Sequence, residues 1–159
     1  MINTNDLNEY SNKVYAYLIK KHSNLVENIS IHPSDFGKNH LRLEIKSINE
    51  NSTHNLFLSS EDNEFTIGFD IYHDHFDSFS SQDFDSEIKV AMDYFNKILS
   101  DVLLVICAGG SASTLLTNEG IKVLESGQIL DSFNYDCITY YVVSWSGHHD
   151  RTFENPKLK

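Results

Sequence analysis

Cysteine, long apolar runs and positive charge are all scarce in this 159-residue chain. Its two cysteines, Cys107 and Cys137, form no Cys-x-x-Cys motif, so the sequence carries no zinc-ribbon or redox signature. Both lie in apolar segments, where we expect buried free thiols. No stretch reaches the roughly 20 apolar residues of a membrane-spanning helix, and the first residues lack the regions of a secretory signal peptide. We therefore expect a cytoplasmic protein with no membrane partner.

Positive charge is scarce because 12 Lys and Arg stand against 23 Asp and Glu, a formal charge of −11. A field of this sign repels a phosphate backbone, so direct binding to nucleic acid is not expected. It attracts a basic protein surface, although a solvated acidic face that only aids solubility gives the same composition. The excess is concentrated in residues 61–101, where two lysines accompany Glu61, Asp62, Glu64, Asp70, Asp74, Asp77, Asp83, Asp85, Glu87, Asp93 and Asp101.

Apolar residues that recur at three- and four-residue steps predict two helices. The first is expected over residues 5–27, with Thr4 or Asn5 as its N-cap. The second is expected over residues 84–100, with Asp83 as its N-cap. Their apolar stripes indicate that both pack on a core.

Alternating apolar and polar residues predict short strands, and the polar turns between the first three favour an antiparallel meander. The sequence therefore predicts one α+β domain over residues 1–159: an antiparallel β-sheet packed with an N-terminal helix and a central amphipathic helix. A polar, partly disordered tail is expected after about residue 147. The strands are expected at residues 29–31, 41–45, 55–58, 64–76, 102–107 and 138–145.

Residues 64–76 read Glu-Phe-Thr-Ile-Gly-Phe-Asp-Ile-Tyr-His-Asp-His-Phe and alternate with a period of two, which predicts one half-buried strand. The odd-numbered positions form its apolar face, and that face continues into His73 and His75. Tyr72 falls on the opposite, polar face and is expected to be exposed. Gly68 indicates a bulge or a close backbone approach.

The two histidines of this stretch are the first candidates for chemistry. His73 and His75 are expected to share a face, where two imidazoles can ligate one zinc, copper or iron ion. Asp70, Asp77 or the pair His148 and His149 could complete such a site. An aspartate beside His73 also suits general acid–base chemistry. The alternative is that the histidines only end a strand at the rim of a sheet. Because His-x-His is a short motif, we expect this alternative, with no metal and no cofactor.

A second segment, Ala-Gly-Gly-Ser-Ala-Ser-Thr at residues 108–114, follows an apolar strand and resembles a backbone anion nest. A phosphate loop also needs a lysine and a following helix, and neither is evident, so a Gly-Gly hairpin is expected. No Ser/His/Asp or Cys/His triad is recognisable in the sequence. We therefore predict no catalytic residues and no enzymatic activity.

Residues 64–76 also resemble a pattern in immunity proteins of bacterial contact-dependent growth-inhibition and polymorphic-toxin systems. There, a strand reading hydrophobic-Thr-hydrophobic-Gly-Phe-Asp-x-x-His-x-His-Phe precedes an amphipathic helix, which corresponds to residues 84–100 of this chain. The rest of the chain agrees with that family only in size, acidity and α+β character.

The resemblance implies an antitoxin that binds and neutralises the C-terminal domain of its cognate toxin, a basic nuclease expected to be a ribonuclease of the EndoU type. The acidic segment agrees with this, because a negative surface can occupy a groove built for phosphates. The alternatives are a metal-dependent enzyme that uses the His-x-His site, and an adaptor for another basic partner. The residues expected to bind the partner are Asp70, Tyr72, His73, Asp74, His75, Asp77, Asp83 and Asp85.

Overall fold

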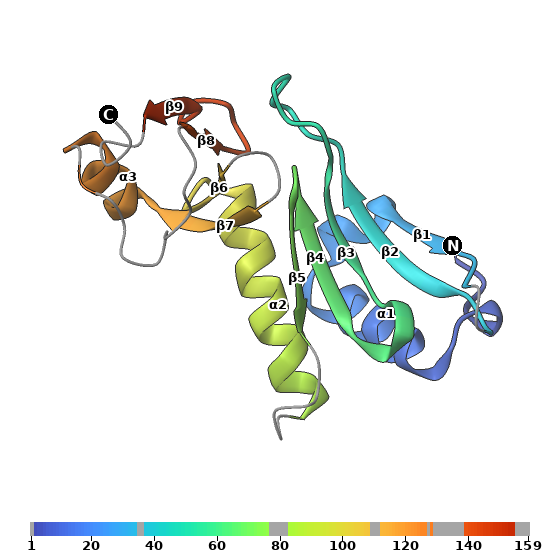
Figure 1. Ribbon diagram of the computed structural model, residues 1–159. Helices are drawn as coiled ribbons and strands as arrows, with labels where there is room; N and C mark the ends of the chain where they lie inside the picture. Colours follow the sequence, from blue (N-terminus) through green and yellow to red (C-terminus); the bar gives the residue numbers. More distant parts are fainter. Residues whose placement is uncertain are drawn as a thin grey trace. The chain divides into compact units, whose positions relative to one another are not determined.

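The computed structural model describes residues 2–34, 37–76, 83–108, 112–126, 128 and 139–154. These residues form an α+β fold with two antiparallel sheets and helices packed on them, which confirms the predicted class (Figure 1). The expectation of one domain stays a prediction. The chain divides into two compact units, unit 1 (Met1–Lys46, Asn55–Gly68 and His73–Phe95) and unit 2 (Ser47–His54, Phe69–Tyr72 and Asn96–Lys159).

Unit 1 is built on a five-stranded sheet whose strands follow one another in chain order, as the predicted meander requires. Short 3-10 turns at Thr4–Asp6, Ser23–Asn28 and Glu61–Asn63 connect its elements. The regular elements are α1 (Glu9–Lys21), β1 (Ile29–His32), β2 (His40–Ile45), β3 (Leu56–Ser59), β4 (Phe65–Phe69), β5 (Tyr72–Phe76) and the first part of α2 (Phe84–Leu99).

The first helix is shorter than predicted, because it is capped inside the expected range at both ends. Asn8, rather than Thr4 or Asn5, is the N-cap of α1, and its Oδ1 accepts a hydrogen bond from Ser11 N at 2.7 Å. His22 ends the helix with a non-helical φ of −137°. The N-cap predicted for α2 is confirmed, since Asp83 Oδ1 accepts from Ser86 N at 2.9 Å.

The predicted strand over residues 64–76 is wrong as a single strand: it is the hairpin of β4 and β5, with Asp70 and Ile71 as its turn. Asp70 has a φ of 55°, a left-handed conformation that Asp tolerates better than most residues. In a hairpin with a two-residue turn, the residue just before the turn and the residue just after it lie opposite each other on the same face of the sheet. The even-numbered residues of β5 therefore share a face with the odd-numbered residues of β4. Tyr72 therefore faces the core and is only 7% exposed, which corrects the prediction of an exposed tyrosine.

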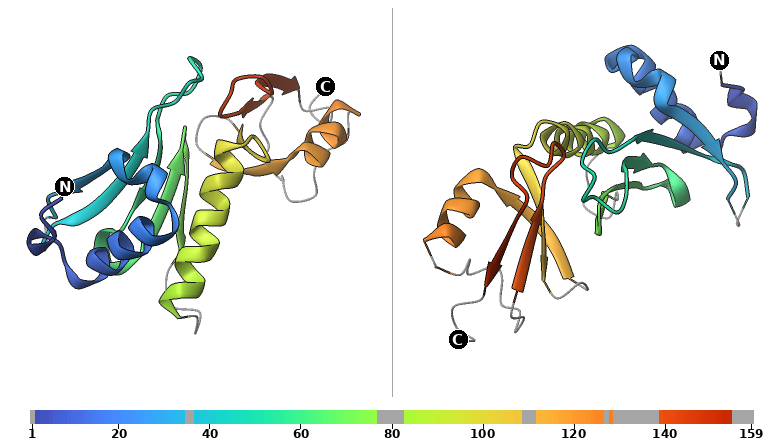
Figure 2. Two further views of the ribbon diagram at one scale, coloured as in Figure 1. Left: turned by 180° about the vertical axis from the view of Figure 1, so that it is seen from behind. Right: turned by 90° about the horizontal axis from the view of Figure 1, so that it is seen from above.

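One face of the unit 1 sheet packs against the helices. Phe65 of β4 lies 5.2 Å from Tyr10 of α1 and 5.8 Å from Phe84 of α2, measured between ring centroids. Figure 2 shows α1 in front of the sheet when the molecule is seen from behind. A buried hydrogen bond of 2.7 Å between Ser11 Oγ and Ser60 Oγ adds a polar contact on this side. The opposite sheet face carries no described helix and is called the open face below.

Unit 2 is built on a four-stranded antiparallel sheet with the strand order β7-β6-β8-β9. The predicted disorder after residue 147 is wrong as far as residue 154, because β9 pairs with β8 there. Gly147, with a φ of 79°, lies in the turn that reverses the chain. The elements are the end of α2, β6 (Leu103–Ala108), β7 (Ala112–Thr117), α3 (Asn118–Glu125), β8 (Thr139–Val143) and β9 (Arg151–Glu154).

Helix α3 covers one face of this second sheet. Thr117 Oγ1 caps the helix by accepting a hydrogen bond from Gly120 N, and Ile121 and Leu124 are buried. Alternate residues of the paired strands meet them in one apolar cluster, to which Phe153 of β9 is added. The cluster consists of Leu104, Ile106, Ala108, Leu116, Ile121, Leu124, Tyr140 and Val142.

A buried amide organises the turn between β8 and β9. Asn49 is 6% exposed, and its Nδ2 donates to Ser144 O at 2.7 Å and to Asp150 Oδ2 at 2.8 Å. Its Oδ1 accepts from Asn51 N at 2.9 Å. Asn49 thereby links both ends of this turn, at Ser144 and Asp150, to the backbone of Asn51 through three hydrogen bonds at a buried position.

We predict that Asn49→Ala lowers the free energy of unfolding by about 2–4 kcal/mol, because three hydrogen bonds are lost at a buried site. Asn51→Ala is the matched control, since Asn51 Nδ2 donates only one exposed hydrogen bond to the same carboxylate, at 3.1 Å. Its cost should stay below about 1 kcal/mol. Urea denaturation of both variants measures the difference, and equal costs would contradict the proposed role of Asn49.

Candidate functional site

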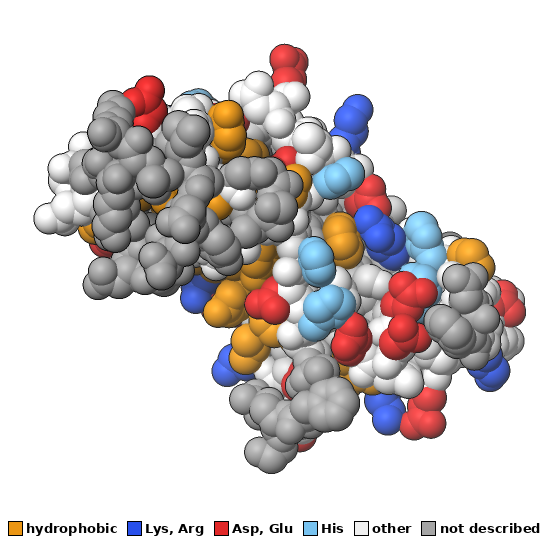
Figure 3. Space-filling view, in the orientation of Figure 1, with side chains coloured by type: hydrophobic (Ala, Val, Ile, Leu, Met, Phe, Trp, Pro, Cys, Tyr) orange, Lys and Arg blue, Asp and Glu red, His pale blue; other side chains and the backbone are white. Residues whose placement is uncertain are grey.

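The candidate site is a hollow on the open face of unit 1. Its volume is about 300 Å³. Figure 3 shows acidic and histidine side chains gathered over this sheet, with few apolar side chains among them. The hollow is lined by Arg42, Phe57, Ser59, Glu61, Asp62, Glu64, Thr66 and His75.

The floor of the hollow is a stack of side chains on Gly68. A Cβ atom at Gly68 would lie 2.3 Å from Phe57 Cε1, so the glycine allows the ring to lie on the sheet. The group that approaches Gly68 closely is a side chain and not the backbone that the sequence indicated. The guanidinium carbon of Arg42 lies 4.0 Å from the centre of the Phe57 ring. Arg42 Nε also donates to Glu44 Oε2 at 2.7 Å. The positive charge of Arg42 is therefore already engaged by a ring and a carboxylate.

Glu44 is held in place beside this guanidinium by the residue that precedes β3. Asn55 Nδ2 donates to Glu44 Oε1 at 2.6 Å while Arg42 occupies the other oxygen. These two hydrogen bonds, first that of Asn55, lower the pKa of the Glu44 carboxyl below its ordinary value. The carboxylate stays ionised, so the pairing with Arg42 persists at mildly acid pH.

Three carboxylates, those of Glu61, Asp62 and Glu64, line the hollow and are called the acidic rim. Glu61 and Asp62 belong to a tight 3-10 turn before β4, in which Asp62 has a φ of 52°. Glu64 Oε1 lies 2.6 Å from His75 Nδ1. With the one guanidinium engaged, the rim leaves the hollow suited to cationic groups rather than to phosphate.

His73 and His75 both lie exposed on the open face, with ring centroids 5.5 Å apart. Thr66 Oγ1 is 3.2 Å from His75 Nδ1, across the hairpin. The prediction that the two imidazoles share a face is confirmed, but they share the polar face rather than the apolar one. Within residues 2–34, 37–76, 83–108, 112–126, 128 and 139–154, no three His, Cys, Asp or Glu side chains are grouped to hold a metal ion. The described residues therefore provide no set of metal ligands in support of the metal-dependent enzyme.

The remaining predicted partner residues lie on different elements, and their assignment to a partner surface stays a prediction. Asp74 is exposed on β5, and Asp83 and Asp85 are exposed at the start of α2, where Asp83 is occupied as the N-cap. Asp77 lies outside the described residues. Asp70 belongs to unit 2 and is only 8% exposed, so it is not a free surface carboxylate.

Sequence reasoning missed the acidic rim as a site, although its residues were counted in the acidic segment. It also missed Phe57, which the alternation of β3 places on the polar face of its strand. The available signal was the pairing of Phe57 with Gly68, which becomes visible only when the register of β3 and β4 is known.

Comparison of the chain with protein-family models, with curated proteins and with solved structures found no match. None of the helices in the described ranges is long and apolar enough to cross a membrane. The function is therefore argued from the site alone.

A buried histidine lies next to the acidic rim and links stability to pH. His40 is 6% exposed, and its Nδ1 lies 3.7 Å from Glu61 Oε1 and has no hydrogen-bond partner among the described residues. Burial lowers the pKa of the imidazole below its ordinary value, and the Glu61 carboxylate offsets this only in part. Because the folded protein then binds the proton less readily than the unfolded chain, stability is present above the ordinary pKa of histidine and is lost as pH falls through it.

We predict that His40→Gln loses less stability than the wild type between about pH 7.5 and about pH 5.5, because glutamine does not titrate. Urea denaturation at several pH values measures the free energy of unfolding. The exposed His54→Gln serves as the control and should follow the wild type. Parallel curves for the wild type and His40→Gln would show that His40 does not carry the pH dependence.

Proposed function

We propose that this protein is an immunity protein, a cytoplasmic antitoxin that binds and neutralises the C-terminal domain of a cognate toxin. The proposed toxin is a basic nuclease, with a ribonuclease of the EndoU type as the expected one. One observation carries the proposal: a hollow lined by three carboxylates, whose single guanidinium is already engaged by Glu44 and Phe57. Such a hollow offers acceptors to cationic side chains and none of the charge that would hold a phosphate.

The proposed mechanism is competition for the toxin's cationic groups. A nuclease binds its substrate with lysines and arginines that are arranged for phosphates, and the carboxylates of the acidic rim can take those positions. Their field also steers the basic partner toward the face before contact is made. Phe57, the aromatic residue in the floor, gives the contact an apolar centre of the kind that dominates protein interfaces. This role needs no catalytic residue, metal or cofactor.

The test is calorimetric titration of the protein with the purified C-terminal domain of the toxin encoded next to it, at low and at moderate salt. We expect tight 1:1 binding that weakens with salt, since exposed charges are screened within about 10 Å at 0.1 M salt. Failure of the wild type to bind would overturn the immunity role, and capture of a different basic protein would favour the adaptor instead.

The acidic rim is tested by the triple variant Glu61→Gln, Asp62→Asn and Glu64→Gln. Association with the toxin domain should slow by about tenfold or more at low salt and become less dependent on salt. Stopped-flow or surface-plasmon measurements give the association rate constant. The matched control removes the same charge from exposed positions elsewhere in unit 1, by Asp6→Asn, Glu9→Gln and Glu27→Gln.

Two outcomes would count against the acidic rim as the contact surface. Equal slowing by the control triple would assign the effect to total charge rather than to the acidic rim. The double variant Asp74→Asn and Asp85→Asn changes two exposed carboxylates that the sequence alone places at the partner surface, and leaves the N-cap residue Asp83 in place. Slowing by this variant, with none from the rim triple, would place the partner on β5 and the start of α2.

A further inference from the structure

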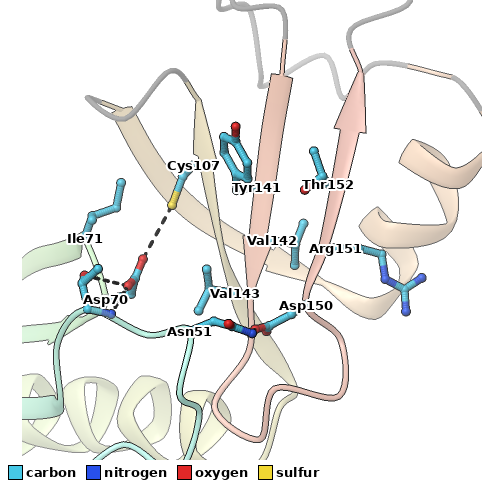
Figure 4. Close-up of a pocket in the computed structure, with 11 residues that line it drawn as sticks. Asn51, Asp70, Ile71, Cys107, Tyr141, Val142, Val143, Asp150, Arg151 and Thr152 are labelled. Carbon is cyan, nitrogen blue, oxygen red and sulfur yellow. Dashed lines mark hydrogen bonds between the residues drawn. The ribbon is translucent and has the colours of Figure 1, made fainter.

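Unit 2 contains a cavity of about 440 Å³, and no residue of the acidic rim lines it. It lies on the sheet face opposite the α3 cluster, where Cys107 of β6 and Thr152 of β9 both pair with Tyr141 of β8. Asp70 and Ile71, from the turn between β4 and β5, close one side of it (Figure 4). The cavity is therefore bounded by a sheet on one side and a tight turn on another.

The carboxylate of Asp70 enters this cavity with unused hydrogen-bonding capacity. Its Oδ1 accepts from Thr53 N and Thr53 Oγ1, both at 2.8 Å. Its Oδ2 has the Cys107 thiol as its described donor, with Sγ at 3.9 Å. A carboxylate offers about four acceptor positions and a thiol is a weak donor, so Oδ2 can accept a stronger donor from the cavity. The residue is 8% exposed, so this oxygen is poorly hydrated.

The Cys107 thiol is a donor here and not a nucleophile. Burial, reinforced by the negative charge of Asp70, raises the pKa of the thiol to about 12. It therefore stays protonated at neutral pH, which disfavours both a thiolate nucleophile and a thiolate metal ligand. No group of three possible metal ligands occurs in the part of the chain that the structure describes, this cavity included.

The other charged side chains of the cavity are already occupied. Asp150 Oδ1 accepts from Ser144 N at 2.7 Å and Ser144 Oγ at 3.0 Å, and its Oδ2 accepts from Asn49 and Asn51. Arg151 pairs with Glu125, and Figure 4 shows its guanidinium turned away from the carboxylate of Asp70. Asp70 therefore carries a charge that the lining does not balance.

The walls beside this carboxylate are apolar. Ile71 and Val143 present aliphatic surface, and Tyr141 is an aromatic residue that is 50% exposed. A carboxylate behind aliphatic and aromatic walls matches a cation on an alkyl stem: the stem packs on the walls, and the cation reaches Asp70 and the ring. We propose that this cavity binds an alkylguanidinium or alkylammonium group, supplied by an arginine or lysine side chain of the basic partner. The identity of the source rests on the proposed function, whereas the ligand chemistry does not.

The chemistry is tested with butylguanidinium as the probe and butylurea as its neutral counterpart. Amide chemical shifts of the full-length protein should move at Thr53, Asp70 and Cys107 with butylguanidinium, with a dissociation constant on the order of millimolar. Butylurea should bind at least about tenfold more weakly, because it forms no charged hydrogen bond. Equal shifts from both probes, or no shifts, would overturn the proposal.

Asp70→Asn is the decisive variant, because asparagine can keep the conformation and the contacts of the turn. Asn also tolerates a φ of 55°, and its Oδ1 can still accept both hydrogen bonds from Thr53. Binding of butylguanidinium should weaken by about tenfold or more. Tyr141→Ala should weaken it by about threefold through loss of the aromatic wall. Asp6→Asn, which changes an exposed carboxylate of unit 1 outside the acidic rim, is the control and should leave probe binding unchanged.

The source of the cation is tested with the toxin domain. Asp70→Asn should raise its dissociation rate constant by about tenfold, whereas the rim triple acts on association. An unchanged dissociation rate, with probe binding still dependent on Asp70, would overturn the partner as the source and leave a free small cation. If the wild-type protein does not bind the toxin domain, the immunity role fails, but the probe titration still decides the chemistry of the cavity.

Discussion

The feature on which the rest of the structure depends is the two-residue turn at Asp70 and Ile71. The carboxylate of Asp70 fixes the turn by accepting two hydrogen bonds from Thr53, and Ser113 Oγ donates to Ile71 O at 3.3 Å. Because the turn holds only two residues, odd-numbered residues face the core in β4 but the open face in β5. Tyr72 therefore faces the core, while His73 and His75 lie on the open face. A turn of one more residue would reverse these assignments, so the composition of the open face follows from this reversal.

The open face can stay uncovered because the ring of Phe57, which lies on it, is shielded locally. Phe57 lies on Gly68 and beneath the Arg42 guanidinium, so the ring is half-buried without a covering helix. Glu44 then neutralises Arg42, which removes the cation that would otherwise offset the acidic rim. The same contacts therefore stabilise the sheet face and leave it negatively charged. An antiparallel sheet with one packed and one solvated face is a common arrangement, and here the solvated face is specialised by charge.

The sequence predicted the elements whose periodicity is local, and missed what depends on pairing. Helix α2 and strands β1 to β3 were found within about two residues, because their apolar spacing is regular. The turn at Asp70 was missed because Phe69, Asp70, Ile71 and Tyr72 continue the alternation and include no glycine or proline. Strand β9 was missed because Arg-Thr-Phe-Glu contains one apolar residue and is held by its pairing with β8. The cavity was out of reach, since Thr53, Asp70 and Cys107 meet only in the folded chain.

The two proposed contacts differ in the rate constant that each controls. The acidic rim is partly exposed to solvent, with Glu61 at 47% and Glu64 at 28% side-chain exposure, so its field reaches into solution and is screened by salt. Such charges act mainly before contact, on association. Asp70 is 8% exposed and reaches a partner only after docking, where a charged hydrogen bond is shielded from water and slows dissociation. Exposure thus assigns a separate kinetic role to each group of carboxylates, and salt should alter the first far more than the second.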